Sequence, residues 1–407
     1  MSILTTDEQL ERFALAPGFR TTATACGLKK SGALDLLMVW SDAPCAAAGL
    51  FTTNRVQAAP VLLDREALSS AAGRIRGVVA NAGCANAVTG DRGMADARRM
   101  QAVAAAAVGA APEEMLVLST GVIGVFLDMD KVERGIATLH SPAGLSGAGE
   151  AARAIITTDT RPKVATTEVR LPDGMVTISG FAKGAGMIHP NMATMLAVIT
   201  TDAKAGPVRL DRALRAAVAG SFNRISVDGD MSTNDTVLLL ASGASGQAVT
   251  DAEEPAFTAA LREVCASLAK QIARDGEGAT RLVELRVTGA TTTAQAHRVG
   301  DSIACSPLVK TAIHGNDPNW GRILAAAGYS GEPIEPARVR LWFGEGDELQ
   351  LLDWGLPAEF DKSQASLLLQ RDPAVIHLDL GLGEAGSVVW TCDFSAEYVR
   401  INADYTT

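Results

Sequence analysis

The chain has 407 residues, of which 36 are Lys or Arg and 46 are Asp or Glu, so its formal net charge is −10. This acidic balance argues against nucleic acid or an anionic membrane as the main partner, because both reward clustered positive charge. Hydrophobic residues make up 47% of the chain, which is enough apolar surface to fold, and the length favours two or three domains.

Strand-like and helix-like segments mix through the first 280 residues. The segment 91–109 is predicted to be a helix, with Asp91 as its N-cap and an Ala-rich interior. A hairpin is predicted over 168–180, because Pro172-Asp173-Gly174 supplies turn geometry between two alternating flanks. Short apolar runs of strand length lie at 34–40, 75–80, 115–118 and 195–199.

The clearest helix is predicted over 255–274, where apolar residues recur every three or four positions and form one stripe. Beyond residue 280 the pattern becomes strand-rich, with one helix-like stretch at 361–370. The strand-like pieces lie at 282–287, 338–343, 348–354, 374–380 and 387–394. We therefore predict a mixed α/β fold with a larger body over 1–280 and a smaller α+β domain over 281–407.

The six cysteines and five histidines are scattered without the spacing of a zinc site or a disulfide framework. We therefore expect buried free thiols in a reducing compartment and no metal site. The first residues, Met1 to Glu8, lack a basic or apolar leader, and no apolar run is long enough to span a bilayer. These features predict a cytoplasmic protein.

The most informative segment runs from Lys183 to Asp202 and begins Lys-Gly-Ala-Gly-Met-Ile-His-Pro-Asn-Met-Ala-Thr. Its glycines lack the spacing of a nucleotide-binding loop. Taken alone, Thr194 is an ordinary strand start, because Thr favours strands and an apolar run follows. Thr120 and Gly121 likewise end a predicted strand, where small residues indicate a turn. The residue types alone therefore favour structural roles.

Several motifs taken together are similar to those of the glutamate N-acetyltransferase family, the bifunctional ornithine acetyltransferase/N-acetylglutamate synthase of arginine biosynthesis. They occur in one order, and the resemblance covers essentially the whole chain. It implies a self-cleaving aminopeptidase/ornithine-acetyltransferase-like fold, in which a layered α-β-β-α catalytic body is followed by a smaller C-terminal α+β domain. The motifs lie at 81–90, 119–124, 157–160, 183–202, 226–236, 275–280, 314–322 and 398–402.

The resemblance implies that the backbone cleaves itself between Ala193 and Thr194, which gives an alpha chain 1–193 and a beta chain 194–407. An α-amino group has a pKa of about 7.7–8.0, so the freed amine of Thr194 can accept the proton of its own hydroxyl. The implied reaction moves acetyl from N2-acetyl-L-ornithine to L-glutamate by a ping-pong cycle through acetyl-Thr194. No bound cofactor is implied, and the use of acetyl-CoA as a further donor stays open.

In this family pattern, the Thr120 hydroxyl and the Gly121 backbone N–H resemble the pair that binds the oxyanion. His189 is expected to be a packing or positioning residue, because the pattern does not require a histidine there. By residue type alone, Lys183 would be a solvated lysine and Glu277 a loop carboxylate. The residues that resemble substrate contacts are Thr157, Lys183, Thr194, Glu277, Asn402 and Thr407.

Two alternatives stay open at this point. A self-processed N-terminal-Thr aminopeptidase or amidohydrolase would use the same nucleophile with water as the acceptor. An uncleaved, non-catalytic binding paralogue would keep the fold without the chemistry. The resemblance also implies assembly as two alpha and two beta chains, with neither nucleic acid nor membrane as a partner.

Overall fold

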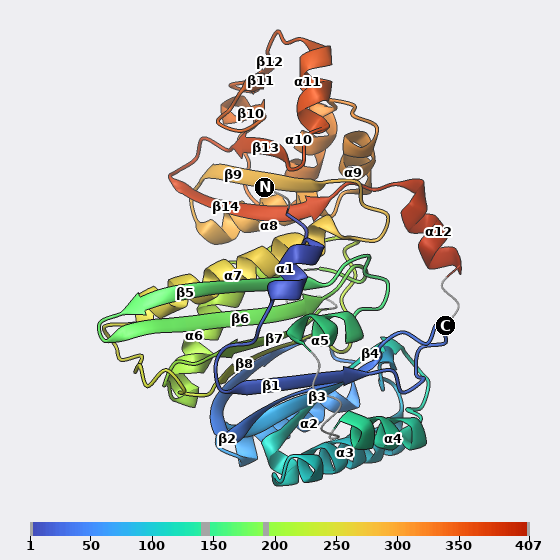
Figure 1. Ribbon diagram of the computed structural model, residues 1–407. Coiled ribbons are helices and arrows are strands. Elements are labelled where there is room, and N and C mark those ends of the chain that lie inside the picture. The colour runs from blue at the N-terminus through green and yellow to red at the C-terminus, as the bar shows by residue number, and fades with distance from the viewer. Residues whose placement is uncertain (1–2, 140–146, 190–194, 405–407) are drawn as a thin grey trace. The chain divides into compact units, whose positions relative to one another are not determined.

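The computed structural model describes residues 3–139, 147–189 and 195–404. Its contacts divide the chain into two compact units. The first comprises Met1–Gly184, Asn191–Asn223 and Met231–Ile272, and the second comprises Ala185–Pro190, Arg224–Asp230 and Ala273–Thr407. Each unit combines helices with its own sheet (Figure 1), which confirms the predicted mixed α/β class. Two short segments, Ala185–Pro190 and Arg224–Asp230, come before residue 273 in the chain but belong to the second unit. A single boundary in the sequence therefore cannot separate the two units.

The first unit contains most of the helices and strands before residue 275. Two of its elements, η3 and α7, each end just inside a segment of the second unit. In chain order they are α1 (Asp7–Arg12), β1 (Phe19–Thr24), β2 (Leu36–Phe51), α2 (Ala59–Ser70), β3 (Arg74–Cys84), α3 (Gly90–Ala107), η1 (Pro112–Glu114), β4 (Met115–Val122), α4 (Met129–Leu139), α5 (Ala148–Ala154), β5 (Lys163–Leu171), β6 (Gly174–Lys183), β7 (Leu196–Thr201), α6 (Pro207–Ala219), η3 (Phe222–Arg224), β8 (Thr236–Ala241) and α7 (Glu254–Arg274).

An eight-stranded sheet forms the centre of the first unit, in the order β4-β3-β2-β8-β7-β6-β5, with β1 also paired to β2. Successive side chains of a strand point to opposite faces. Leu36 and Met38 of β2 accordingly pack in a core with residues of α3 and α4, whereas Leu37 and Val39 belong to a second core. The helices α2, α3 and α4 lie together along this sheet (Figure 1). Both faces of the first part of β2 are thus buried.

The strands predicted before residue 200 are confirmed as parts of β2, β3, β4 and β7, and the predicted hairpin is confirmed as β5 and β6. The predicted helix 255–274 is α7. The helix predicted over 91–109 is α3, but its N-cap is Thr89, so the prediction of Asp91 as the cap is wrong. Asp91 lies in the first turn, where its carboxylate still favours the positive end of the helix dipole.

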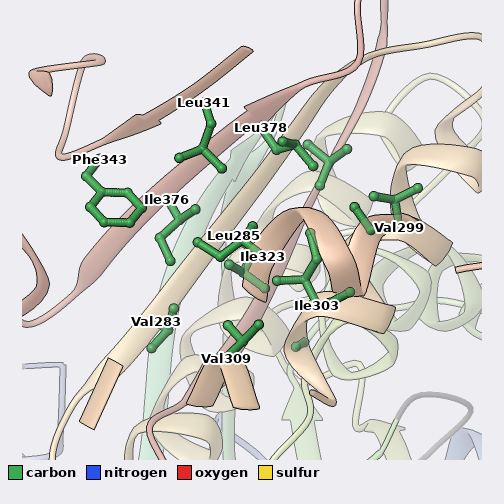
Figure 2. Packing of buried hydrophobic residues seen from close by; sticks show 14 of the residues in the cluster. Val283, Leu285, Val299, Ile303, Val309, Ile323, Leu341, Phe343, Ile376 and Leu378 are labelled. Atoms are coloured by element: carbon green, nitrogen blue, oxygen red, sulfur yellow. The ribbon is translucent and has the colours of Figure 1, made fainter. Parts of the chain in front are cut away.

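The second unit has a six-stranded sheet in the order β12-β11-β10-β13-β9-β14. Figure 2 shows its core, in which Leu285, Leu341 and Ile376 of the sheet lie with Val299 and Ile303 of the first helix after β9. The elements of this unit are β9 (Leu282–Ala290), α8 (Thr293–Ala304), α9 (Pro307–His314), α10 (Trp320–Gly328), η4 (Pro336–Arg338), β10 (Arg340–Phe343), β11 (Leu349–Asp353), β12 (Leu356–Pro357), α11 (Lys362–Leu369), β13 (Ala374–Asp379), β14 (Ala385–Cys392) and α12 (Ala396–Asp404).

The prediction that one helix interrupts the strands of this region is wrong, because α8, α9, α10 and α12 are also helical. The side chains of Thr292, Ser306 and Asn319 each accept a hydrogen bond from a backbone N–H in the first turn of α8, α9 or α10. Ser306-Pro307 is itself a helix-start signal. Cap residues therefore mark the starts of these helices. Over the ranges that the structure describes, no helix is both long and apolar enough to cross a membrane.

Candidate active site

The C-terminal end of β4 carries Thr120 and Gly121, and the backbone there requires glycine. β4 runs parallel to β3, and Gly121 has φ +133°. A Cβ at Gly121 would lie 2.3 Å from the carbonyl carbon of Gly83 on β3, which is closer than two carbon atoms can approach. Thr120 is 5% exposed. The site therefore begins at a strand end where glycine lets two backbones approach closely.

Buried amide and hydroxyl side chains hold this strand end in place. Ser119 Oγ donates to Asn81 Oδ1 at 2.7 Å, and Asn81 Nδ2 donates to the carbonyl of Cys84 at 2.9 Å. Asn234 Nδ2 donates to the carbonyls of Ser119 and Ala85 at 2.9 and 2.7 Å. Because buried polar groups are costly to leave unpaired, this network favours one arrangement of the ends of β3 and β4.

Lys183, the last residue of β6, reaches the Thr120 side chain. Its Nζ donates to Thr120 Oγ1 at 3.2 Å in a buried contact. Lys183 is 3% exposed, so it is not a solvated surface lysine. An ammonium group can only donate, so Thr120 Oγ1 is the acceptor, and the hydroxyl proton of Thr120 stays available for another acceptor.

A buried carboxylate, Asp159, balances the positive charge around Lys183. Its Oδ1 accepts from Lys163 Nζ at 2.5 Å and from the backbone N–H of Gly184 at 2.6 Å, and its Oδ2 accepts from the N–H of Thr157 at 3.0 Å. The side chains of Asp159 and Lys163 are fully buried. Burial alone raises the pKa of Asp159, but Lys163, Lys183 and the hydrogen bonds outweigh it and hold the pKa well below its ordinary value.

A second buried carboxyl group lies at the start of β7. Lys183 pairs with Leu196 in the ladder of β6 and β7, so this start lies beside Lys183. The backbone N–H of Met195 donates to Asp235 Oδ1 at 3.1 Å. Asp235 is fully buried, and burial raises the pKa of its carboxyl group well above the ordinary value. Asp235 thus holds the residue that follows Thr194.

In the second unit, the predicted substrate residues Glu277 and Asn402 contact each other. Asn402 Nδ2 donates to Glu277 Oε2 at 2.8 Å and to the carbonyl of Tyr398 at 3.0 Å. Glu277 is 8% exposed, and its backbone N–H donates to the carbonyl of Ala185 at 2.9 Å. A Cβ at Gly186 would lie 2.5 Å from Glu277 Oε2, so glycine makes room for the carboxylate.

Asp228 holds the backbone just before His189. It accepts from the N–H groups of Met187 and Ile188 at 2.7 and 2.9 Å, and Tyr398 Oη donates to it at 3.3 Å. Burial raises the pKa of the Asp228 carboxyl group above its ordinary value. The segment 185–189 is thus held within the second unit by the side chain of Asp228 and by the backbone N–H of Glu277.

The predicted site residues fall into two described groups. Those of the first unit surround one buried polar network, and those of the second unit form a contacting pair. Their predicted roles stay predictions, as do those of the three residues that lie outside the described ranges. The first group is Thr120, Gly121, Thr157 and Lys183, the second is Glu277 and Asn402, and the residues outside are Ala193, Thr194 and Thr407.

Three charged residues in the networks of the first unit, Asp159, Lys163 and Asp235, were not predicted from the sequence. Asp159 and Asp235 lie inside motifs that carry the family resemblance, at 157–160 and 226–236, so position in a motif was an available signal. Lys163 has no such signal, because a lysine is usually exposed and its full burial follows from the fold.

Comparison with known proteins agrees with the motifs. The sequence model of the ArgJ family matches residues 20–407. The "Arginine biosynthesis bifunctional protein ArgJ" of Geobacter sulfurreducens is 49% identical over 394 residues, which cover 96% of this chain and 99% of that protein. The protein of the same name from Symbiobacterium thermophilum is 48% identical over 398 residues, covering 96% and 98%. A crystallised chain of this bifunctional protein from Bacillus halodurans is 43% identical and covers 51% of this chain and 97% of its own, with a TM-score of 0.49. Because the family model and the identity extend over almost the whole chain, the predicted resemblance is confirmed and the chain belongs to the ArgJ family.

Proposed function

We propose that this chain transfers acetyl from N2-acetyl-L-ornithine to L-glutamate in arginine biosynthesis, through an acetyl ester on Thr194. The family match and the name of the relatives support a biosynthetic role. The observation that carries the chemistry is the buried contact of Lys183 Nζ with Thr120 Oγ1, beside the start of β7. It leaves the Thr120 hydroxyl as a donor next to the strand that Thr194 precedes.

The reaction follows from these groups. After cleavage between Ala193 and Thr194, the free amine of Thr194 accepts the hydroxyl proton while Oγ attacks the acetyl carbonyl. The carbonyl oxygen becomes an oxyanion that accepts hydrogen bonds from the Thr120 hydroxyl and the Gly121 N–H. The C–N bond then breaks, the Thr194 ammonium returns the proton to the leaving amine, and ornithine departs. In the second half of the cycle, the amine of glutamate attacks the carbonyl of the acetyl ester and gives up a proton. The bond to Thr194 Oγ then breaks, the hydroxyl regains its proton, and N-acetylglutamate departs.

Lys183 acts on this step through Thr120. Its ammonium group donates to Thr120 Oγ1, which draws electron density from the hydroxyl and makes it a stronger donor. Asp159 keeps the local charge balanced through Lys163 and the Gly184 N–H. Asp235 acts on the nucleophile by holding Met195 at the start of β7. Asp159 and Asp235 are positioning residues, and Lys183 is both a positioning residue and a proposed substrate contact. Thr194, Thr120 and Gly121 touch the reacting atoms.

Glu277 and Asn402 suit an ammonium group of the substrate. Asn402 donates to Glu277 Oε2, so the second carboxylate oxygen and the Asn402 carbonyl oxygen both remain as acceptors. Two acceptors with one negative charge complement the cationic group that acetyl-ornithine carries in its side chain. Thr157 and Thr407 are further proposed substrate contacts.

Intact-mass analysis before and after addition of N2-acetyl-L-ornithine tests the function. We expect two fragments, 1–193 and 194–407, and one acetyl group gained on the second fragment alone. Addition of L-glutamate should remove the acetyl group and produce N-acetylglutamate. A single full-length mass would support the binding paralogue, and loss of the acetyl group to water without glutamate would support the hydrolase. The same assay with acetyl-CoA decides whether it also donates.

Thr120→Ala should lower kcat by about 10²–10³-fold, because one of two oxyanion donors is lost. KM for acetyl-ornithine should change little, since this hydrogen bond forms in the transition state. Steady-state kinetics measure both constants. Thr120→Ser keeps the hydroxyl and is the matched control, which should retain most of kcat. A raised KM with an unchanged kcat would contradict the oxyanion role.

Glu277→Gln should raise KM for acetyl-ornithine by roughly 10–100-fold, because a charge-assisted hydrogen bond to the substrate is worth about 1.5–3 kcal/mol. The Gln carbonyl can still accept from Asn402, so the change removes charge and keeps the local contact. Glu384→Gln, at an exposed position, is the control and should leave KM unchanged. An effect confined to kcat would show that Glu277 does not bind the substrate.

We also propose assembly as two alpha and two beta chains in the cytoplasm, with no bound cofactor in the transfer steps. The six free cysteines are consistent with a reducing compartment, and each chemical step above uses groups of the chain and its two substrates. Native mass spectrometry of the purified protein tests the assembly.

A further inference from the structure

Three metal-ligating side chains of the second unit converge on one point outside the residues assigned to acetyl transfer. His189 Nδ1 lies 3.4 Å from Cys305 Sγ and 4.0 Å from Asp301 Oδ1, and Cys305 Sγ lies 3.7 Å from the same Asp301 oxygen. One nitrogen, one sulfur and one oxygen thus form a closed triangle. The residue types are those that zinc and similar divalent transition metals prefer.

The dimensions of this triangle fit a tetrahedral site. With Zn–S bonds of about 2.3 Å and Zn–N or Zn–O bonds of about 2.0–2.1 Å, adjacent ligand atoms lie about 3.6 Å apart when one is sulfur and about 3.3 Å apart otherwise. The two edges at Cys305 Sγ already have this length. The edge from His189 to Asp301 has to shorten, which rotation of either side chain can provide.

Two of these ligands, Asp301 of α8 and its C-cap residue Cys305, lie on the side of the helix away from the hydrophobic core. Val299 and Ile303 of α8 point into the hydrophobic core of the second unit (Figure 2). Asp301 and Cys305 are four residues apart and therefore share the opposite face of the helix. The side chains of His189 and Asp301 are 27% and 26% exposed, so an ion and a water ligand can reach them.

A further histidine on the same face adds an independent observation. His297 lies one turn before Asp301, and its Nδ1 is buried with no hydrogen-bond partner among the described residues. Ser226 Oγ lies 3.3 Å from Cys305 Sγ and 3.2 Å from the carbonyl of Ile188, which ties the cysteine to the segment that carries His189. Such outer contacts orient ligands in metal sites.

The geometry does not suit a nucleophilic cysteine. In a catalytic triad the nucleophile and the carboxylate bind opposite nitrogens of the imidazole ring. Here the Cys305 thiol and the Asp301 carboxylate approach the same nitrogen, Nδ1 of His189. Convergence on one point is typical of ligands around an ion.

We propose that His189, Asp301 and Cys305 bind one divalent transition-metal ion of the zinc class, with water in the fourth position. Metal binding requires only these side chains. A consequence that rests on the proposed function is that, after cleavage, His189 belongs to the alpha chain and the other two ligands to the beta chain. The ion then bridges the two fragments near the new end of the alpha chain.

Titration of the full-length, chelator-treated protein with Co²⁺ and then Zn²⁺ tests the site. We expect one equivalent of Co²⁺ to produce a thiolate-to-cobalt charge-transfer band, which Zn²⁺ displaces. Zn²⁺ should also protect Cys305 from alkylation by iodoacetamide, measured by peptide mass spectrometry. Cys26 is the internal control, because it is the other partly exposed cysteine and should react equally with and without zinc.

Cys305→Ser should abolish the charge-transfer band. Asp301→Asn or His189→Gln should weaken Zn²⁺ binding by about 100-fold or more. This is a larger effect than the loss of a residue that only contacts a metal ligand usually has. Cys26→Ser should bind Zn²⁺ as the wild type does. The uncleaved Thr194→Ala variant should also bind one equivalent, which separates this proposal from the acetyl-transfer function. Absence of the band in the wild type, or zinc-independent alkylation of Cys305, would show that the triangle is a thiol hydrogen-bond cluster only.

Discussion

The variant Thr194→Ala is expected to remain a single chain of 407 residues with no measurable acetyl transfer. The hydroxyl is needed twice, first to attack the preceding carbonyl during self-cleavage and then to accept the acetyl group. Without cleavage, the nitrogen of residue 194 remains an amide and cannot accept the proton. Denaturing electrophoresis measures the cleavage, and intact-mass analysis after addition of acetyl-ornithine measures the adduct.

Thr194→Ser provides the matched control for this prediction. It keeps a hydroxyl at the same position, so it should still cleave and should still gain an acetyl group. Two fragments from Thr194→Ala would place the scissile bond elsewhere. An acetyl adduct on the uncleaved Ala variant would show that another side chain is the nucleophile. Either result would contradict the proposed mechanism.

The variant Asp159→Asn is expected to lose about 3–5 kcal/mol of unfolding free energy, because it removes the negative charge from a buried ion pair. Asp159 and Lys163 are fully buried, and Lys183 adds a second positive charge to the same carboxylate. Asn can accept a hydrogen bond but carries no charge. Urea unfolding of the purified variant measures the change.

The contribution of Asp159 also has a defined pH dependence. The pKa of Asp159 in the folded protein lies below its ordinary value of 3.8, so its stabilisation is fully present above that value. As the pH falls below 3.8, the unfolded chain takes up the proton first and the stabilisation is lost progressively. Asp159→Asn should therefore show a smaller loss of stability than the wild type over this acidic range.

Asp42→Asn is the matched control for the buried pair. Asp42 pairs with Arg20 at the surface, where the two side chains are 69% and 55% exposed. Solvent-exposed ion pairs contribute about 0–1 kcal/mol, so this variant should unfold almost like the wild type. Equal destabilisation by Asp42→Asn and Asp159→Asn would contradict the structural role assigned to the buried pair.

The active-site groups could be predicted from the sequence to different degrees. Thr120, Gly121, Lys183, Glu277 and Asn402 were assigned by motif resemblance, since their residue types alone indicate a turn, a surface lysine or a loop. The contact of Lys183 with Thr120, and that of Asn402 with Glu277, join residues far apart in the chain. No local pattern predicts such a contact.

The local sequence pattern predicted those helices and strands in which apolar residues recur at a regular spacing. The strands within β2, β3, β4 and β7, the hairpin at 168–180 and the helix α7 all follow from alternation, turn residues or an apolar stripe. Helix α8 was not predicted, although its buried residues Ala296, Val299, Ile303 and Ala304 recur at helical spacing and Thr292 caps its start.

The sequence by itself determined the mixed α/β class, the strands with alternating or wholly apolar character, and the family to which the motifs belong. The tertiary structure alone decided the burial of Lys163 against Asp159, the pairing of Asp235 with Met195, and the triangle of His189, Asp301 and Cys305. Periodicity reports neighbours within one element, because it arises from the repeat of a helix or a strand. Charge pairing and ligand geometry depend on which distant segments the folded chain brings together.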